Sequence, residues 1–287
     1  MGVEEFLRYL IQIERKPEAQ RRASQKAPPW DIAAIWELPK MIDGVQMGQT
    51  FPAHWADSVW SGSVSRWDGK SVWGRSDAVL HLPLDETDPS NNRTYRDYSG
   101  HELLGTISGA GPIRASGKVG YGVANNGGAG YLDMGADANY NIIGSMTMMA
   151  WTKLNVVPGS MTPSRDYIME KTGGGDNDGP RFFFQKSSAS LRFEVVKFGT
   201  VHAVGSTKSD WAANVWYHIA GRYGAGTLAL LIDGVLDGTV VDAFGAVPTN
   251  TYPCTIARAF EGTVDDPRWY DKAVRDTEIK YIAEHPI

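Results

Sequence analysis

Carboxylate pairs are the first groups in this sequence that could do chemistry. Retaining glycoside hydrolysis needs two carboxyl groups about 5 Å apart, one as nucleophile and the other as general acid. The nearest approach to such a pair is Glu86-Thr87-Asp88, in a Pro- and Asn-rich stretch after a predicted strand. No second Glu follows in register, because Ser90 and Asn91 occupy the next candidate positions. We therefore interpret this stretch as a turn and expect no enzyme, with a glycosidase as the less favoured alternative.

Covalent chemistry has few other candidates. The chain contains one cysteine and six histidines. Cys254 lies in an apolar, strand-like stretch, where we expect a buried and inert thiol. His218 lies between Trp216 and Ile219 in a predicted strand, which favours a packed or hydrogen-bonded ring over a catalytic base. We assign no catalytic residue.

Composition excludes several classes of partner. The 287 residues are 42% apolar and carry a net charge of −5 with a pI near 5.7, whereas nucleic-acid binding usually needs a basic face. No apolar run approaches the roughly 18 residues of a membrane span. Charged residues interrupt positions 1–16, so we expect no signal peptide. A single cysteine favours assembly in a reducing compartment.

The chain divides by composition into a helix, an arm and a domain. Residues 1–16 have the apolar spacing of an amphipathic helix, with Phe6 and Leu10 on its apolar face. Residues 17–77 are rich in Gly, Pro and Trp and keep no regular period, so we expect an extended arm. The arm carries six tryptophans: Trp30, Trp36, Trp55, Trp60, Trp67 and Trp73. Burial against other subunits is favoured for these side chains, with packing on the downstream domain or stacking on sugars as alternatives.

Residues 78–287 predict an all-β domain. Short strands separated by Gly, Asn, Asp and Pro recur without intervening helices, which is typical of a two-sheet antiparallel sandwich. The strongest hairpin turn is Asp233-Gly234, and a helix over 277–282 capped by Asp276 or Thr277 closes the chain. The predicted strands cover 79–84, 118–124, 145–154, 167–171, 181–186, 189–196, 201–205, 215–223, 227–232, 239–241, 252–257 and 263–270.

These landmarks together resemble one family, the laminin-G-like branch of the concanavalin A-like jelly rolls, found in bacterial and phage proteins. Six stretches carry the resemblance in the expected order: 79–85, 95–101, 117–123, 146–153, 216–234 and 260–270. The stretch Gly117-Lys118-Val119-Gly120 is similar to a G-K-x-G strand of the family. The resemblance implies a concanavalin A-like jelly roll, a fold that hosts lectins, hydrolases and spacers alike.

The resemblance also implies a possible calcium site, since many relatives hold calcium at a sheet rim through carboxylates and carbonyls. Asp85 and Asp265 form one candidate pair, because the first and last strands pair in this fold. Asp176 and Asp178, in a Gly-rich loop, form another. For Asp265 the alternative is a side chain that hydrogen-bonds to backbone at a strand bend.

Three functions remain open. The favoured one is a phage virion protein, a decoration, fibre or tail component assembled in the host cytoplasm. Residues 1–77 would bind other virion subunits or further copies of the chain, and the jelly roll would face outward. The second is a carbohydrate-binding module, compatible with the first, and the third a glycoside hydrolase. The polar groups predicted to converge on a glycan are Asn125, Asn126, Asp166, Arg181 and Arg258.

Overall fold

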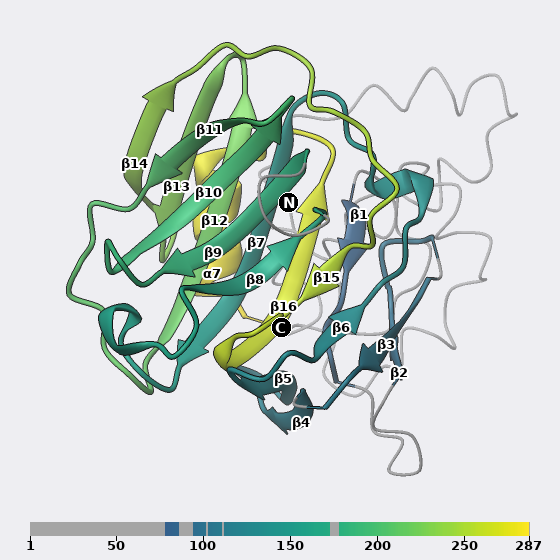
Figure 1. The fold of residues 1–287 in the computed structure, drawn as a ribbon, viewed down its shortest axis with the longest axis vertical. Coiled ribbons are helices and arrows are strands. Elements are labelled where there is room, and N and C mark those ends of the chain that lie inside the picture. The colour runs from purple at the N-terminus through teal and green to yellow at the C-terminus, as the bar shows by residue number, and fades with distance from the viewer. Residues whose placement is uncertain (1–77, 86–93, 102, 111, 173–177, 287) are drawn as a thin grey trace, which may run out of the picture. The chain divides into compact units, whose positions relative to one another are not determined.

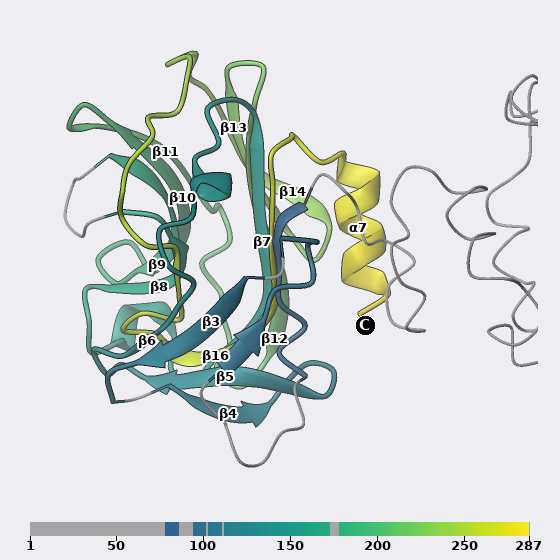
Figure 2. The ribbon, with the colours of Figure 1, turned by 90° about the vertical axis from the view of Figure 1, so that its right-hand side faces the viewer.

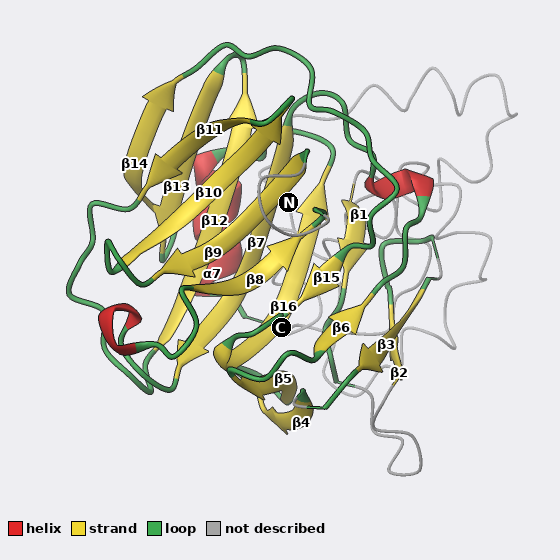
Figure 3. Ribbon diagram, viewed as in Figure 1, coloured by secondary structure: helices red, strands yellow, loops and turns green. Residues whose placement is uncertain are grey.

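A computed structural model describes residues 78–85, 94–101, 103–110, 112–172 and 178–286. Two antiparallel sheets face each other across one core, and a single α-helix follows the last strand (Figure 1). Short strands dominate this part of the chain, with helical turns confined to connections (Figure 3). The predicted all-β jelly-roll sandwich is confirmed. The predicted helix over 1–16 and the arm over 17–77 lie outside the described residues.

The strand order of both sheets interleaves distant parts of the chain. Sheet A runs β14-β13-β12-β7-β16-β5-β4, with β1 also paired to β16, and sheet B runs β11-β10-β9-β8-β15-β6-β3-β2. The bounds are β1 Ala78–His81, β2 Thr94–Arg96, β3 Leu104–Ser108, β4 Ile113–Ser116, β5 Tyr121–Asn126, β6 Tyr131–Asp133, β7 Met146–Leu154, β8 Arg165–Glu170, β9 Gly179–Gln185, β10 Ser190–Lys197, β11 Thr200–Gly205, β12 Trp216–Gly224, β13 Thr227–Ile232, β14 Val235–Val241, β15 Thr255–Ile256 and β16 Glu261–Tyr270. Helix α7 spans Asp276–Glu284, and 3-10 turns span Ala138–Tyr140 and Pro158–Ser160.

Every predicted strand has a counterpart, but the boundaries and number differ. The first strand ends at His81 instead of position 84, and the strand predicted over 252–257 is reduced to β15. Strands β2, β3, β4 and β6 were not predicted, because their three to five residues are too short for alternation to show. Helix α7 begins with Asp276 as its first residue after an Arg275 cap, so neither Asp276 nor Thr277 is the N-cap.

Three hairpins use two-residue turns with both residues at positive φ, as the right-handed twist of paired strands requires. The predicted Asp233-Gly234 turn is confirmed, with φ values of 50° and 75°. The others are Ala225-Gly226 and Phe198-Gly199, where Phe198 has a φ of 51°. A non-Gly residue in this region costs roughly 1–2 kcal/mol, and Asn or Asp bears it best. Phe198 therefore makes its turn less stable than Asn or Asp would.

The main core fills the space between the sheets, and a smaller one lies under helix α7. Between the sheets, Phe182 and Phe193 of sheet B are fully buried with Trp269 of sheet A. On the outer side of sheet A, Met149 and Leu231 are buried with Ile279 of the helix. Figure 2 shows α7 on the side of sheet A that faces away from sheet B. Helix α7 thus covers part of the outer side of sheet A.

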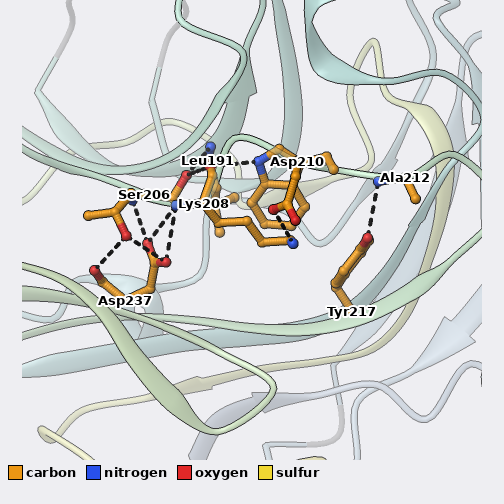
Figure 4. A network of polar contacts seen from close by, with 9 residues as sticks. Leu191, Ser206, Lys208, Asp210, Ala212, Tyr217 and Asp237 are labelled. Carbon is orange, nitrogen blue, oxygen red and sulfur yellow. Dashed lines mark hydrogen bonds and ion pairs between the residues drawn. The ribbon is translucent and has the colours of Figure 1, made fainter.

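The connection between β11 and β12 is tied to both sheets (Figure 4). Asp237 of β14 accepts hydrogen bonds from the backbone N–H groups of Thr207 and Lys208, at 2.6 and 3.1 Å. From sheet B, the N–H of Leu191 donates to Ser206 Oγ. The loop is thus anchored to both sheets.

Candidate functional site

None of the residues predicted to form the interface is among those that the structure describes. Phe6, Leu10 and the tryptophans of the arm lie outside the described residues, and so do Asp176 and the Glu86-Thr87-Asp88 stretch. The site must therefore be built from the sandwich and its loops.

Asp85 and Asp265 do come together, but around a backbone turn. Strand β1 pairs with β16, as predicted, and both carboxylates reach the β4–β5 turn. Asp265 Oδ2 accepts from the N–H groups of Lys118 and Val119 at 2.7 and 3.2 Å, and Asp85 Oδ1 accepts from Tyr121 N–H at 2.8 Å. A Cβ at Gly120 would lie 1.9 Å from Asp85 Oδ1, so only glycine fits there. Backbone N–H groups of the G-K-x-G stretch and of the next residue thus bind both carboxylates.

This geometry predicts that calcium does not stabilise the domain through Asp85 and Asp265. Their hydrogen-bonded oxygens face N–H donors, which repel a cation. Among the described residues no group of three or more His, Cys, Asp or Glu side chains is arranged for a metal. We expect the same melting temperature with calcium chloride as with EDTA. A rise with calcium that Asp178→Ala abolishes would instead locate a site in the Gly-rich loop.

Asn125 and Asn126 have unequal roles. Asn125 is buried, and its amide donates to three backbone carbonyls, those of Gly128, Gly130 and Ala257, at 2.9–3.1 Å. It therefore fixes the loop after β5 and has no donor left for a ligand. Asn126 is exposed and accepts a hydrogen bond from Asn155.

Asp166 points into the sandwich and not toward solvent. It is fully buried, and its Oδ2 accepts the N–H of Glu261 at 2.9 Å, which links β8 to β16. Its Oδ1 has no hydrogen-bond partner, and burial raises the pKa of Asp166 to about 7. A carboxyl group with a raised pKa beside Glu261 has the chemistry of a general acid. Without exposure, however, Asp166 cannot reach a substrate, so the pair forms no active site.

Arg181 and Arg258 both belong to the outer face of sheet B. Arg181 is fully buried and contacts Glu194 at 2.6 Å, and Arg258 pairs with Glu170. The register places one polar row across the whole sheet: Thr94, Thr106, Asp133, Thr255, Glu170, Arg181, Glu194 and Ala203. Directly opposite residues share a face in antiparallel pairs. Two of the five predicted glycan residues therefore meet on this face, while Asp166, one residue along the chain from Tyr167, points the other way.

The reactive side chains are sequestered. Burial raises the pKa of the Cys254 thiol and lowers the pKa of His218 to about 3. His218 lies edge-on to Trp151, with ring centroids 5.3 Å apart. Both predictions, an inert thiol and a packed histidine, are confirmed, and neither residue is available as a nucleophile or base.

A shallow pocket of about 510 Å³ lies beside the Phe198-Gly199 turn. Its lining consists of Asp178, Phe198, Gly199, Thr249, Asn250, Thr251 and Tyr252. Phe198 is 82% exposed and Tyr252 36% exposed, so both rings are accessible at the pocket. The Nζ of Lys197 lies over the Phe198 ring, 5.8 Å from its centroid. The combination of open aromatic rings with hydroxyl, amide and carboxylate groups is suited to a polar ligand with an apolar face.

The pocket wall is held rigid by a buried lysine. Lys171 is 1% exposed, and its Nζ donates to the carbonyl oxygens of Asn250 and Tyr252 and to Asn250 Oδ1, at 2.8–3.0 Å. In return, Asn250 Nδ2 donates to the carbonyls of Lys171 and Asp178. The lining segment is thus tied to β8 and to the start of β9 before any ligand arrives.

Asp178 was predicted as a metal ligand, whereas Phe198 and Tyr252 were not predicted as site residues. Phenylalanine is not a typical turn residue, so its type alone does not indicate a site at Phe198. The available signal was Gly199 between two alternating strands, which predicts a two-residue turn whose first position Phe198 must fill.

The sheet order, the terminal helix and the rim loops together define a lectin-like jelly-roll domain. The sequence profile of the concanavalin A-like lectin/glucanases superfamily matches residues 126–280, more than half of the chain. The chain belongs to this superfamily. No curated protein sequence matches it. No helix in the described part of the chain is long and apolar enough to cross a membrane.

Solved structures share the fold at low identity. The binding domain of Paraclostridial Mosquitocidal Protein 1 has a TM-score of 0.57 and 16% identity, over 72% of this chain and 52% of that one. The receptor binding domain of botulinum neurotoxin D has 0.56 and 11%, over 73% and 52%. Domain 4 of AbnA, an extracellular arabinanase from Geobacillus stearothermophilus solved with arabinotriose, has 0.54 and 17%, over 72% and 98%. The chain thus spans about half the length of the two toxin domains.

Proposed function

We propose that this domain binds a carbohydrate in the pocket between Phe198 and Tyr252 and catalyses no reaction. The observation that carries the proposal is Phe198 itself. It is a bulky residue at positive φ, 82% exposed, at the edge of a pocket with polar lining. Strained backbone at a ligand-facing residue supports a functional role.

The chemistry of the pocket supports a sugar in particular. Aromatic rings offer flat apolar faces on which the C–H face of a pyranose can rest. Thr249 and Thr251 provide hydroxyl groups, and Asp178 can accept hydrogen bonds from sugar hydroxyls. Because Lys171 and Asn250 already hold the wall, little ordering entropy remains to be lost on binding.

Structural relatives with bound sugars add support. The AbnA domain was solved with arabinotriose, and a botulinum neurotoxin D binding domain with N-acetylneuraminic acid. Their identities to this chain are 17% and 12%, so they bear on the choice of ligand class and not on its identity.

Replacing Phe198 by Asn separates ligand binding from stability. Asn tolerates positive φ, so Phe198→Asn should raise stability, by about 1 kcal/mol, while it removes the ring. We expect glycan-array signals to fall roughly tenfold, the loss of one stacked aromatic contact. Ala225→Asn is the matched control, since it makes the same change at the Ala225-Gly226 turn and should raise stability without altering binding.

Two array results would contradict this proposal. Wild-type protein without any glycan signal would remove carbohydrate binding altogether. Equal signals for wild type and Phe198→Asn would show that the sugar binds elsewhere. Tyr252→Ala provides a second readout on the opposite ring of the same pocket.

We further propose that the chain is a phage virion component, with residues 1–77 bound to other virion subunits or to further copies of the chain. The six tryptophans of residues 17–77 support this, because arms rich in Trp bury large apolar areas at subunit interfaces. The full chain should sediment as an oligomer or on virions, and Trp30→Ser/Trp36→Ser should weaken that association. A monomeric full chain that does not bind virions would contradict it.

A further inference from the structure

The outer face of β8, β9 and β10 combines arginines with aromatic rings outside the pocket. We call it the arginine face and define it as Arg165, Tyr167, Glu170, Arg181, Phe183, Arg192 and Glu194, together with Arg258 of the loop before β16. Opposite residues in the register join Tyr167 to Phe183 and Phe183 to Arg192 in a second row beside the polar row. The residues therefore form one continuous cluster on the outer side of three strands, in which Arg165, Tyr167, Arg192 and Arg258 are partly exposed.

At least one guanidinium group lies over each aromatic ring of the face. Arg258 lies over Tyr167, with its Cζ 4.7 Å from the ring centroid. Arg165 and Arg181 lie over Phe183 at 5.3 and 5.6 Å, and Phe183 is fully buried although it points away from the core. Arg258 contacts the buried Glu170 through its Nε, and Arg192 contacts the buried Glu194 in the same way. The donors of Arg258 and Arg192 that could meet a ligand are therefore their terminal N–H groups.

Two arginines of the face are more exposed than its acids, whereas Arg181 is as buried as the acids are. The two acids, Glu170 and Glu194, are 1% and 3% exposed, whereas the side chains of Arg192 and Arg258 are 28% and 27% exposed. Four arginines and two glutamates give the face a charge of +2 (4 − 2), in a chain whose net charge is −5. The acids orient the arginines from below, so a ligand that approaches the face meets cations.

Arg258 is also held in place by strained backbone. Its neighbours Ala257 and Ala259 have φ values of 56° and 51°, a region that alanine rarely occupies. Backbone hydrogen bonds enforce this conformation, since Tyr167 N–H donates to the carbonyl of Arg258, and Ala257 N–H to the carbonyl of Ile168. The strained residues on both sides of Arg258 fix the direction of its side chain.

We infer that the arginine face binds an acidic oligosaccharide through its carboxylate groups, at a second site separate from the Phe198 pocket. The inference rests on the proposed carbohydrate function and gives the ligand a charge. Adjacent strands lie about 4.8 Å apart, so Tyr167 and Arg192 are about 10 Å apart across β9. Arg258 lies on the far side of Tyr167 from Arg192, so a short oligosaccharide is long enough to contact both of these partly exposed arginines. Guanidinium groups bind carboxylates through paired hydrogen bonds.

The test compares trigalacturonate with its methyl ester, which has the same skeleton without charge. Calorimetric titration of the full chain should show binding of the acid, at least tenfold weaker binding of the ester, and weaker binding at higher salt. Arg192→Gln/Arg258→Gln should lower affinity for the acid at least tenfold. The control Arg275→Gln/Lys280→Gln removes the same charge from helix α7 and its N-cap and should not change binding. Arg258→Lys keeps the charge but not the fork, and should be intermediate.

The outcomes separate this inference from the proposed pocket. Phe198→Asn should leave trigalacturonate binding unchanged. If Phe198→Asn abolishes it and the arginine variants do not, the arginine face is no site while the pocket proposal stands. Equal binding of acid and ester, or no binding of either, would also overturn the inference. A thermal melt of each variant in the absence of sugar identifies any loss that comes from unfolding.

Discussion

Asp266→Asn should destabilise the domain by about 3–5 kcal/mol, the usual cost of leaving a buried charge without its partner. Asp266 accepts two hydrogen bonds from Arg268, at 2.9 and 2.6 Å, and contacts His81 Nε2 at 3.0 Å. All three residues are at most 4% exposed. Asparagine keeps the shape and tolerates the positive φ of 47° at this position, so the variant removes mainly charge. Domains are stable by only about 5–15 kcal/mol, so the loss should be large in urea unfolding.

The control for this prediction removes both charges. Asp266→Asn/Arg268→Gln no longer buries an unpaired guanidinium group and should recover at least half of the loss, which a double-mutant cycle measures. Equal stability of wild type and Asp266→Asn would contradict a structural role for the pair.

The same cluster predicts the acid limit of the domain. Burial alone would raise the pKa of Asp266, but Arg268 and His81 outweigh it and lower the pKa to about 2. A carboxyl group with a lowered folded-state pKa stabilises the native state above its unfolded pKa of about 3.9. That contribution is lost as the pH falls from about 4 toward 2. Stability that persists unchanged to pH 2 would contradict the assignment.

Asp166→Asn should have the opposite sign and raise stability above neutral pH. Burial raises the pKa of Asp166 to about 7, above the usual 3.8 of an aspartate side chain. The native state therefore binds more protons than the unfolded chain between pH 4 and 7, so stability falls as the pH rises through this window. Three pKa units correspond to about 4 kcal/mol as an upper limit. We expect a gain of about 2–4 kcal/mol at pH 8 and little gain at pH 4.

Asp166→Asn also keeps the hydrogen bond that links β8 to β16. The amide oxygen of asparagine can still accept the N–H of Glu261, which bonds Asp166 Oδ2 in the wild type. Burial also raises the pKa of Asp265 to about 7. The stability of Asp166→Asn should therefore still fall with rising pH over the same range, because of Asp265. Asp210→Asn is the control, because Asp210 is exposed and should not alter the profile. Urea unfolding at pH 4 and pH 8 decides between these outcomes, and equal effects at both values would contradict the prediction.

The long strands were predictable because each carries its own pattern. Strand β7 and strand β13 begin and end within a residue of their predicted bounds, since their apolar residues continue over six to nine positions. The Asp233-Gly234 turn was predictable because both residues favour positive φ. Strands β2 and β6 were not, because three residues form a strand only where a neighbouring strand supplies hydrogen bonds.

Among the candidate site residues, side-chain direction decided the outcome. Asp166 and Tyr167 are adjacent in sequence, yet one points into the core and the other onto the arginine face. Asn125 is a polar loop residue by composition and a buried backbone staple in the structure. Phe198 lies between two predicted strands and is an exposed ring at a turn in the structure. Each assignment depends on a register or a turn that is set by distant strands.

By itself, the sequence determined the sandwich and its family, because alternation and turn residues act over a few positions at a time. The resemblance to that family in turn implied the pairing of the first and last strands. Only the tertiary structure decided which partners the polar groups bind. The approach of Asp85 and Asp265 was expected, but their hydrogen bonds to the β4–β5 turn were not. Arg258 reaches Tyr167 only through the strand order of sheet B. The chemistry of this domain lies in contacts between residues far apart in the chain, and a local pattern carries no information about such distances.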